Sequence, residues 1–312
     1  MENNEINRND TQKQVSPEKK RKTHLAISLS IIAAALVIAA IFAIVAVVGS
    51  IVSKEGLSLD GTKLNGQTAS ELYDDIESCM TENNNYTVSL TKHGIVAANA
   101  QGTSLSIEIN SHIDSRVDGN NFYYKKTTTT KYRSAINNEM TTDESVIEIT
   151  VVDGYVYFTK AGQKFKVPVN SDEYRKNFDV ISEMVWEDGG NIFKDAKITE
   201  KDGGYSVSAT NIDKKIVGND ARSFFNGTKG EFIWALMPIY SGESCGVTYD
   251  SDSRPVSSSY GYTISNDALS ALVAPLTGSV AMSANVSYGG VSVSRPADAG
   301  EYTEVGADQL PQ

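Results

Sequence analysis

The residue types that most often carry catalysis or metal binding are few and widely spread in this sequence. It has three histidines, His24, His93 and His112, and two cysteines, Cys79 and Cys245. Metal ligands must converge on one point, and zinc sites commonly take cysteines in pairs such as C-x-x-C. Neither residue type shows such spacing here, so the sequence predicts no metal site and no cofactor.

Two short motifs resemble known functional sequences but stand in the wrong context. Residues 89–92 read SLTK, the S-x-x-K form of penicillin-binding enzymes, yet that motif opens a helix and here it lies in an alternating strand pattern. Residues 250–253 read DSDS, like the start of a calcium loop, but the Gly and the distant Glu of that loop are missing. A hairpin turn explains the second motif better. No triad spacing surrounds the histidines, so we assign no catalytic residue and predict a protein that is not an enzyme.

A basic cluster lies in an otherwise acidic sequence. Lys125, Lys126, Lys131 and Arg133 are interleaved with tyrosines. They could bind an anionic polymer, but lysines on an edge strand also block unwanted pairing, and we prefer that interpretation. Beyond residue 24 the chain has 22 basic and 35 acidic residues, a net charge of −13. Such a charge repels nucleic acid, so we expect no nucleic-acid partner.

A long apolar segment near the N-terminus predicts a membrane anchor. Residues 25–52 contain no charged side chain. As a helix at about 1.5 Å per residue they would span roughly 40 Å, more than a hydrocarbon core of about 30 Å requires. A cleaved signal peptide has an apolar core of only about 7–15 residues. We therefore expect an uncut single-pass helix in the lipid bilayer of the cell membrane.

The flanks of this segment set its orientation and the domain boundaries. A basic cluster directly precedes it and predicts a cytoplasmic N-terminus, with the C-terminal domain extracellular. The cluster consists of Lys19, Lys20, Arg21 and Lys22. The predicted parts are a disordered cytoplasmic tail (1–24), the transmembrane helix (25–52), a linker (53–67), an extracellular β-rich domain (68–305) and a C-terminal tail (306–312).

The extracellular part changes from one helix to repeated strands. Thr68 and Glu71 have the T-x-x-E spacing of a capping box, which predicts a helix start. After residue 85 apolar and polar residues alternate again and again, typical of half-buried antiparallel strands joined by short turns. A second helix is predicted over residues 171–186, where apolar residues form one stripe.

The inward residues of these strands predict a surface for a hydrophobic ligand. Long strands with one apolar face must curve around either a ligand or the protein's own helices. The candidate lining residues are Leu105, Ile107, Ile109, Ile147, Ile149, Val151 and Met282, with Trp234 from the apolar run at 232–240. Cys79 and Cys245 also project from apolar faces and are candidates for a disulfide, with two free buried thiols as the alternative.

Two stretches carry a resemblance to a known family. CGVTYDSDSRPVSSSYGYTI, residues 245–264, and SANVSYGGVSVSRPADAGEYTEV, residues 283–305, resemble the strand, turn and return strand and the closing strands of the LolA/LolB/LppX-like carrier superfamily. The resemblance implies a half-open curved sheet roofed by helices, used in relatives to hold acyl chains or lipoproteins. This chain departs from the family in lacking a lipidation cysteine, and no functional residue is carried over.

The residues and the resemblance together predict a mainly β (α+β) fold. We expect a large curved antiparallel sheet, a half-barrel, covered by two or three helices and preceded by one transmembrane helix. The predicted function is a membrane-tethered, extracellular, non-enzymatic domain that binds a lipid or another hydrophobic ligand. The alternative is a cell-envelope module for protein–protein interaction or structure, with a filled core. A roomy apolar cavity would favour the first function, and a solid core the second.

Overall fold

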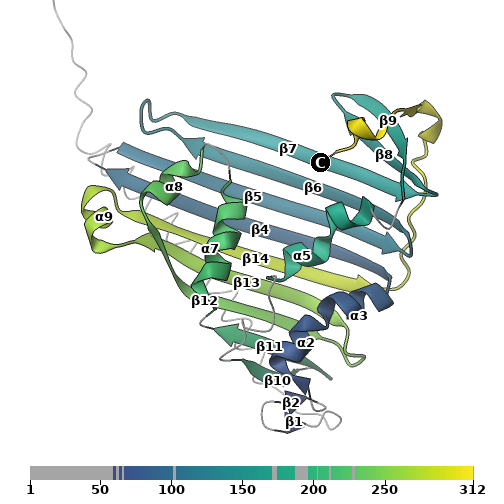
Figure 1. Ribbon diagram of the computed structural model, residues 1–312, viewed down its shortest axis with the longest axis horizontal. Coiled ribbons are helices and arrows are strands. Elements are labelled where there is room, and N and C mark those ends of the chain that lie inside the picture. Colours follow the sequence, from purple (N-terminus) through teal and green to yellow (C-terminus); the bar gives the residue numbers. More distant parts are fainter. Residues whose placement is uncertain are drawn as a thin grey trace, which may run out of the picture. The chain divides into compact units, whose positions relative to one another are not determined.

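The computed structural model describes residues 59–60, 63–64, 67–100, 103–170, 174–186, 196–201, 203–210, 212–226 and 229–311. They form a twelve-stranded sheet, preceded by a small three-stranded one (Figure 1). This confirms the prediction of a mainly β fold. The predicted anchor at 25–52 lies outside the described residues, and none of the helices within them is long and apolar enough to span a membrane.

The elements follow one another in a long meander with helical interruptions. The strands are β1 (Leu59–Asp60), β2 (Lys63–Leu64), β3 (Gln67–Thr68), β4 (Asn85–Ala100), β5 (Thr103–Asp118), β6 (Asn121–Arg133), β7 (Met140–Val152), β8 (Tyr155–Lys160), β9 (Gln163–Pro168), β10 (Lys197–Lys201), β11 (Gly204–Thr210), β12 (Pro238–Tyr249), β13 (Pro255–Asn266), β14 (Leu276–Tyr288) and β15 (Thr303–Glu304). The helices are α2 (Ala69–Asp74), α3 (Ile76–Glu82), η1 (Lys176–Phe178), α5 (Val180–Met184), α7 (Lys214–Phe224), α8 (Glu231–Ala235), α9 (Ala268–Val273), η2 (Ala299–Glu301) and η3 (Ala307–Gln309).

The sheet is open and mixed rather than purely antiparallel. Its order is β10-β11-β12-β13-β14-β4-β5-β6-β7-β8-β9-β15. All neighbours are antiparallel except β15, which pairs with β9 in parallel, so the antiparallel prediction needs that correction. The long strand β14 pairs with β4 from Leu276 to Tyr288 and joins the two halves of the meander. The centre of the sheet is therefore built from segments far apart in the sequence.

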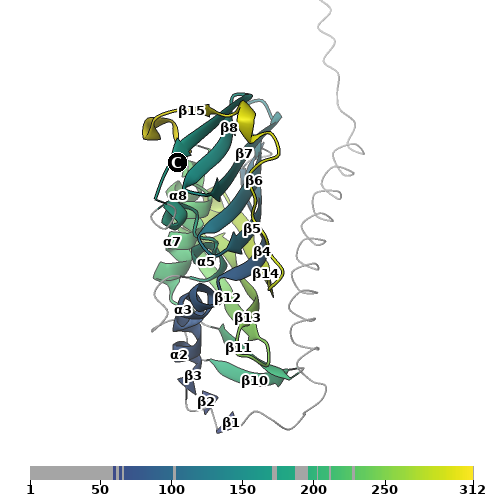
Figure 2. The same cartoon turned by 90° about the vertical axis from the view of Figure 1, so that its right-hand side faces the viewer.

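The alternation of side chains separates the two faces of the sheet. Figure 2 shows the short helices α3, α5 and α7 on one face, which we call the inner face. Along β4 the residues Tyr86, Val88 and Leu90 turn to this face and are only 1–2% exposed. The outer face is rich in serine and threonine, for example Ser283 and Ser287 on β14. This is the pattern expected for strands with one face packed and one face in water.

The two predicted helices form in shorter pieces. The capping box is confirmed, since Glu71 N–H donates to Thr68 Oγ1 and Thr68 N–H donates to Glu71 Oε2. The helix is interrupted at Asp75, giving α2 and α3. The predicted helix at 171–186 divides into η1 and α5, because Asp179 is extended and caps the start of α5 through a hydrogen bond from Ile181 N–H.

One further prediction needs correction against the strand order. The basic strand β6 is not an edge, since β5 and β7 pair with its two sides. Its lysines contact acids instead: Lys125 pairs with Glu148 on the outer face, and Lys126 with Glu183 on the inner face. The segment expected to be a linker at 53–67 contributes Leu64 to the core, where it is 1% exposed.

Candidate functional site

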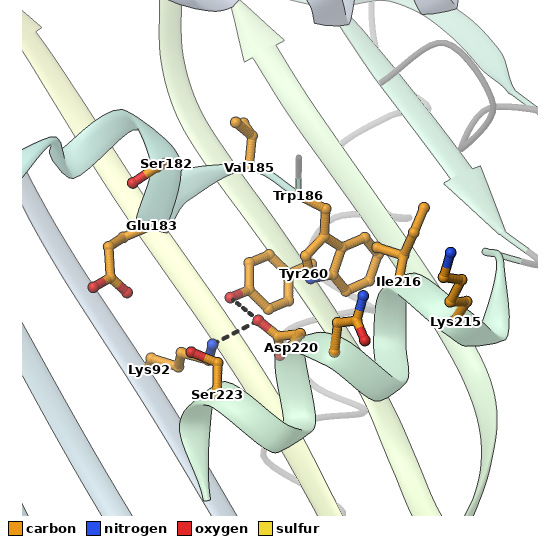
Figure 3. A pocket seen from close by; sticks show the side chains of 11 residues that line it. Lys92, Ser182, Glu183, Val185, Trp186, Lys215, Ile216, Asp220, Ser223 and Tyr260 are labelled. Carbon is orange, nitrogen blue, oxygen red and sulfur yellow. Dashed lines mark hydrogen bonds and ion pairs between the residues drawn. The ribbon is translucent and has the colours of Figure 1, made fainter. Parts of the chain in front are cut away.

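A groove on the inner face lies between α5 and α7. It encloses about 480 Å³ and is open to solvent at its rim. Figure 3 shows that α5 supplies one wall, α7 the other and β13 part of the floor. Lys92, Trp186, Asp220 and Tyr260 are buried or nearly so at the base of the groove, whereas Lys215 is exposed at the rim. The remaining lining residues are Ser182, Glu183, Val185, Ile216, Asn219 and Ser223.

The base of the groove holds a buried ion pair. Lys92 Nζ lies 2.7 Å from Asp220 Oδ1, and their side chains are only 7% and 11% exposed. Tyr260 donates to Asp220 Oδ1 at 3.0 Å, and Tyr262 donates to Oδ2 at 2.7 Å. Figure 3 draws the contacts of Asp220 with Lys92 and with Tyr260. A buried charge requires such compensation, because leaving it unpaired costs several kcal/mol. The network therefore ties α7 to β4 and β13.

The sequence of α7 explains how Asp220 reaches this place. Asp213 caps the helix by accepting a hydrogen bond from Lys215 N–H at 2.8 Å. Val217 and Ala221 lie four residues apart and are fully buried on the sheet, which turns Asp220 toward Lys92. Gly94 lets the end of α7 approach, because a Cβ there would lie 2.6 Å from a ring carbon of Phe224.

A second cavity lies beside the first. It encloses about 310 Å³ and shares Lys92, Glu183 and Ser223 with the groove. It also contains the ion pair between Lys126 and the shared Glu183, which are 2.6 Å apart and about 30% exposed. The other lining residues are Ile109, Ser111, Thr128, Thr130, Phe224 and Asn226. Both cavities are thus amphiphilic, with charged and apolar side chains side by side.

Trp186 has an unsatisfied hydrogen-bond donor at the groove. Its ring packs on Tyr260 with centroids 4.6 Å apart, and its backbone N–H donates to the Tyr73 hydroxyl. The indole Nε1 is buried and has no hydrogen-bond partner among the described residues. A buried donor left unpaired costs about 1–3 kcal/mol, so such groups are usually satisfied by water or a ligand.

The two tyrosines of the network have raised pKa values. Burial, then the neighbouring Asp220 carboxylate, raises the pKa of Tyr260 and of Tyr262 well above the ordinary value. Both phenols therefore stay protonated and act as donors at neutral pH. Asp220 therefore accepts hydrogen bonds from Lys92, Tyr260 and Tyr262 together.

The predicted ligand-lining residues are placed mainly in the packed core. Ile107, Ile149, Val151 and Met282 are at most 3% exposed. Ile109 lines the second cavity. Ile147 and Trp234 are partly buried against the core, and Leu105 is half-buried. Their role as a ligand surface remains a prediction.

Two short motifs of the described residues, DSDS at 250–253 and GESCG at 242–246, have structural explanations. The segment 250–253 forms the predicted turn between β12 and β13, where Asp250 accepts hydrogen bonds from Arg254. Partial burial raises the pKa of Asp250, but these hydrogen bonds outweigh it and hold that pKa below the ordinary value. Residues 242–246 read GESCG and match the G-x-S-x-G form of hydrolase nucleophiles. They lie inside β12 rather than at a strand-to-helix turn, so Ser244 lacks the geometry of a nucleophile.

Both cysteines are free thiols in the structure, so the candidate disulfide is not formed in it. Cys245 is buried in the core, whereas Cys79 lines a small cavity of about 250 Å³ near Tyr249. No group of three or more His, Cys, Asp or Glu residues within the described ranges could hold a metal ion.

Thiol titration is expected to distinguish the two cysteines. Burial raises the pKa of Cys245 to about 12 and also raises that of the half-exposed Cys79. With Ellman's reagent at pH 8, Cys79 should react slowly in the folded protein and Cys245 only after unfolding, because the thiolate is the reactive form. Cys79→Ser should abolish the reaction of the folded protein. A titration that finds no thiol in the unfolded, non-reduced protein would establish the disulfide instead.

The sequence contained one unused signal for this site. Lys92 has the same parity on β4 as Tyr86, Val88 and Leu90, so an inward lysine was visible in the alternation. An inward lysine implies a buried acid. Its partner could not be named, because residues 214–224 were not predicted to form a helix.

Comparisons with known proteins show only faint similarities. No protein-family model matches the chain, and no curated protein matches it in sequence. Among solved structures the chain is similar to LprF from Mycobacterium bovis, with 13% identity over 73% of this chain and 96% of that chain and a TM-score of 0.24. It is also similar to a DUF1329 family protein from Desulfovibrio piger, with 12% identity over 72% and 93% and a TM-score of 0.16. Similarities this low decide nothing about function. The resemblance to the carrier superfamily therefore stays a prediction.

Proposed function

We propose that this domain is a non-enzymatic binding module that takes up an amphiphilic ligand, such as a single-chain lipid, in the groove between α5 and α7. The observation that carries the proposal is the indole N–H of Trp186, which is buried and has no hydrogen-bond partner among the described residues. A ligand reaches this N–H by displacing the side chains that cover it, and its acceptor then lies at the base of the groove. The ligand head that accepts this hydrogen bond is an anionic or carbonyl-bearing group, and Lys215 adds a cation at the rim of the groove.

The mixed lining defines the rest of the ligand. Val185, Trp186 and Ile216 offer apolar surface for a hydrocarbon part. A wholly apolar ligand would cover Lys92 and Asp220 without replacing the hydrogen bonds that these groups make to water. Burying polar groups in this way costs free energy. The volume of about 480 Å³ lies within the usual range of about 300–1,000 Å³ for small-ligand sites. A ligand longer than the groove would pass over Lys92 and Ser223 toward the second cavity.

The membrane segment supplies the setting of this proposal. With residues 25–52 in the bilayer and the basic cluster at Lys19 to Lys22 inside the cell, the domain would stand outside, close to the lipid surface. A module tethered there meets single-chain lipids as they leave the bilayer.

A second candidate function is an envelope module for protein–protein interaction. It is favoured by the filled core, since Ile107 and Ile149 are each 1% exposed and leave no dry apolar cavity at their positions. The two candidates differ in one measurable property: only the first requires a ligand at Trp186.

Tryptophan fluorescence tests the proposal directly, because the protein has only two tryptophans, Trp186 and Trp234. In a Trp234→Phe variant, decanoic acid below its micelle concentration is expected to shift the emission of Trp186, because its carboxylate accepts the indole hydrogen bond. Decylamine, with the same chain but no acceptor, should bind at least about fivefold more weakly, since a charge-assisted hydrogen bond contributes about 1.5–3 kcal/mol.

Two controls complete this titration. Acetate, which has the head without the chain, should give no shift at the same concentration. A Trp186→Phe variant, which keeps Trp234, should show no change with decanoic acid. Equal responses to decanoic acid and decylamine, or no response to either, would contradict the proposed site.

A further inference from the structure

The first part of β7 forms the longest open sheet edge among the described residues. β6 pairs with β7 from Met140 to Val151, whereas β8 pairs only with residues 149–152. The nine residues 140–148 therefore have a described strand on one side only, and Figure 1 shows β8 beside just one end of β7. Eight of these nine are exposed. Their outward backbone N–H and C=O groups form a template for another strand.

This edge lacks several of the usual devices that prevent pairing. Natural edges are blocked by short strands, charged side chains (lysines above all), prolines or bulges. Residues 140–148 contain no Lys, Arg or Pro, and their register with β6 runs without a bulge. By comparison β10, at the opposite end of the sheet, has five residues and carries Lys197 and Lys201 at its ends. The β7 edge is thus long and carries only acidic charges, whereas the β10 edge is short and carries lysines.

The exposed side chains of the edge indicate which kind of strand would fit. Met140 and Val146 are 49% and 51% exposed, two of the few exposed large apolar residues described. Glu144 lies between them on the outer face and makes no ion pair within the described part of the chain. The other two acids are already paired, Asp143 with Lys229 and Glu148 with Lys125.

The geometry points to β7 as a docking edge for an extended basic segment of another protein, which adds one strand to the sheet next to residues 140–148. The added strand places a lysine or arginine opposite Glu144 and an apolar side chain against Val146, because facing residues on paired strands interact directly. A second copy of this chain fits less well, since two β7 edges would bring together strands that each carry three carboxylates and no base.

Peptide binding tests this inference independently of the groove. The probes are fluorescein-labelled peptides TVTKTVTKT and TVTETVTET, which place Val and the charged residues two positions apart on one face and differ only in the sign of their charges. Fluorescence anisotropy is expected to give at least about tenfold tighter binding of the basic peptide. Glu144→Lys should weaken that binding by about tenfold, because it replaces an attractive cross-strand pair with a repulsive one. Glu77→Lys, an equal charge change on exposed α3, should leave it unchanged.

Hydrogen exchange locates the bound peptide. The basic peptide should slow amide exchange in residues 140–148 of the wild type and not in the Glu144→Lys variant, with both folds checked by circular dichroism. Unchanged affinity in Glu144→Lys, or protection confined to other strands, would overturn the inference. So would a wild-type dimer in sedimentation whose residues 140–148 are already protected without peptide, since a second copy would then occupy the edge.

Discussion

Ile149→Glu is expected to unfold the domain rather than merely empty a ligand site. Ile149 is 1% exposed and packs in the core on the inner face of β7. A carboxylate there has no partner, and the lost apolar contacts add to the cost. The loss is on the order of 5 kcal/mol or more against a total stability of about 5–15 kcal/mol. Urea denaturation followed by circular dichroism measures it.

Val146→Glu is the matched control on the same strand. Val146 is also β-branched but is 51% exposed on the outer face, so the same change should cost less than about 1 kcal/mol. If Ile149→Glu instead keeps its fold while losing bound lipid, the inner face holds a ligand at this position. That result would restore the apolar lining predicted from the sequence.

Asp220→Ala is expected to destabilise the domain by about 3–5 kcal/mol, because it leaves the buried charge of Lys92 without a counter-ion. Lys92 is only 7% exposed on its side chain and would lose its counter-ion, while Tyr260 and Tyr262 would lose their acceptor. The same change loosens α7 over the groove. Urea denaturation gives the free energy, and the Trp234→Phe background reports the environment of Trp186 in the same samples.

A double-mutant cycle separates the ion pair from general damage to the helix. Lys92→Met combined with Asp220→Ala should lower the free energy of unfolding by at least about 2 kcal/mol less than the sum of the two single changes. The reason is that the double variant has no unpaired buried charge. Arg295→Ala is the exposed comparison: its partner Asp153 lies 2.7 Å away, but both side chains are more than half exposed. It should cost less than about 1 kcal/mol. Additive effects at Lys92 and Asp220 would contradict the assigned network.

Local patterns predicted the elements well. The capping box at Thr68 and Glu71 and the alternation along β4 and β5 depend on neighbours in the sequence, and both are confirmed. The turn at Asp250 was predicted for the same reason. Broken helices were harder, because the interruption at Asp179 depends on one side chain capping a new helix in place of continuing the old one.

Strand order and the site depend on contacts that no local pattern shows. β6 resembled a protected edge because its lysines are conspicuous, but whether a strand has two neighbours is decided by distant segments. The groove joins Lys92 from β4, Trp186 after α5 and Asp220 from α7, three segments separated by long stretches of chain. The sequence indicated that Lys92 faces inward, but not which acid it meets.

Mass spectrometry of the protein purified from membranes tests the central claim most directly. The full chain should carry about one equivalent of an amphiphile with an anionic or carbonyl head. A Trp186→Phe variant, shown to be folded by circular dichroism, should carry much less ligand. Phenylalanine has no N–H at the base of the groove to donate a hydrogen bond to the ligand head. A wild-type protein free of any amphiphile, or equal occupancy in wild type and Trp186→Phe, would contradict the account.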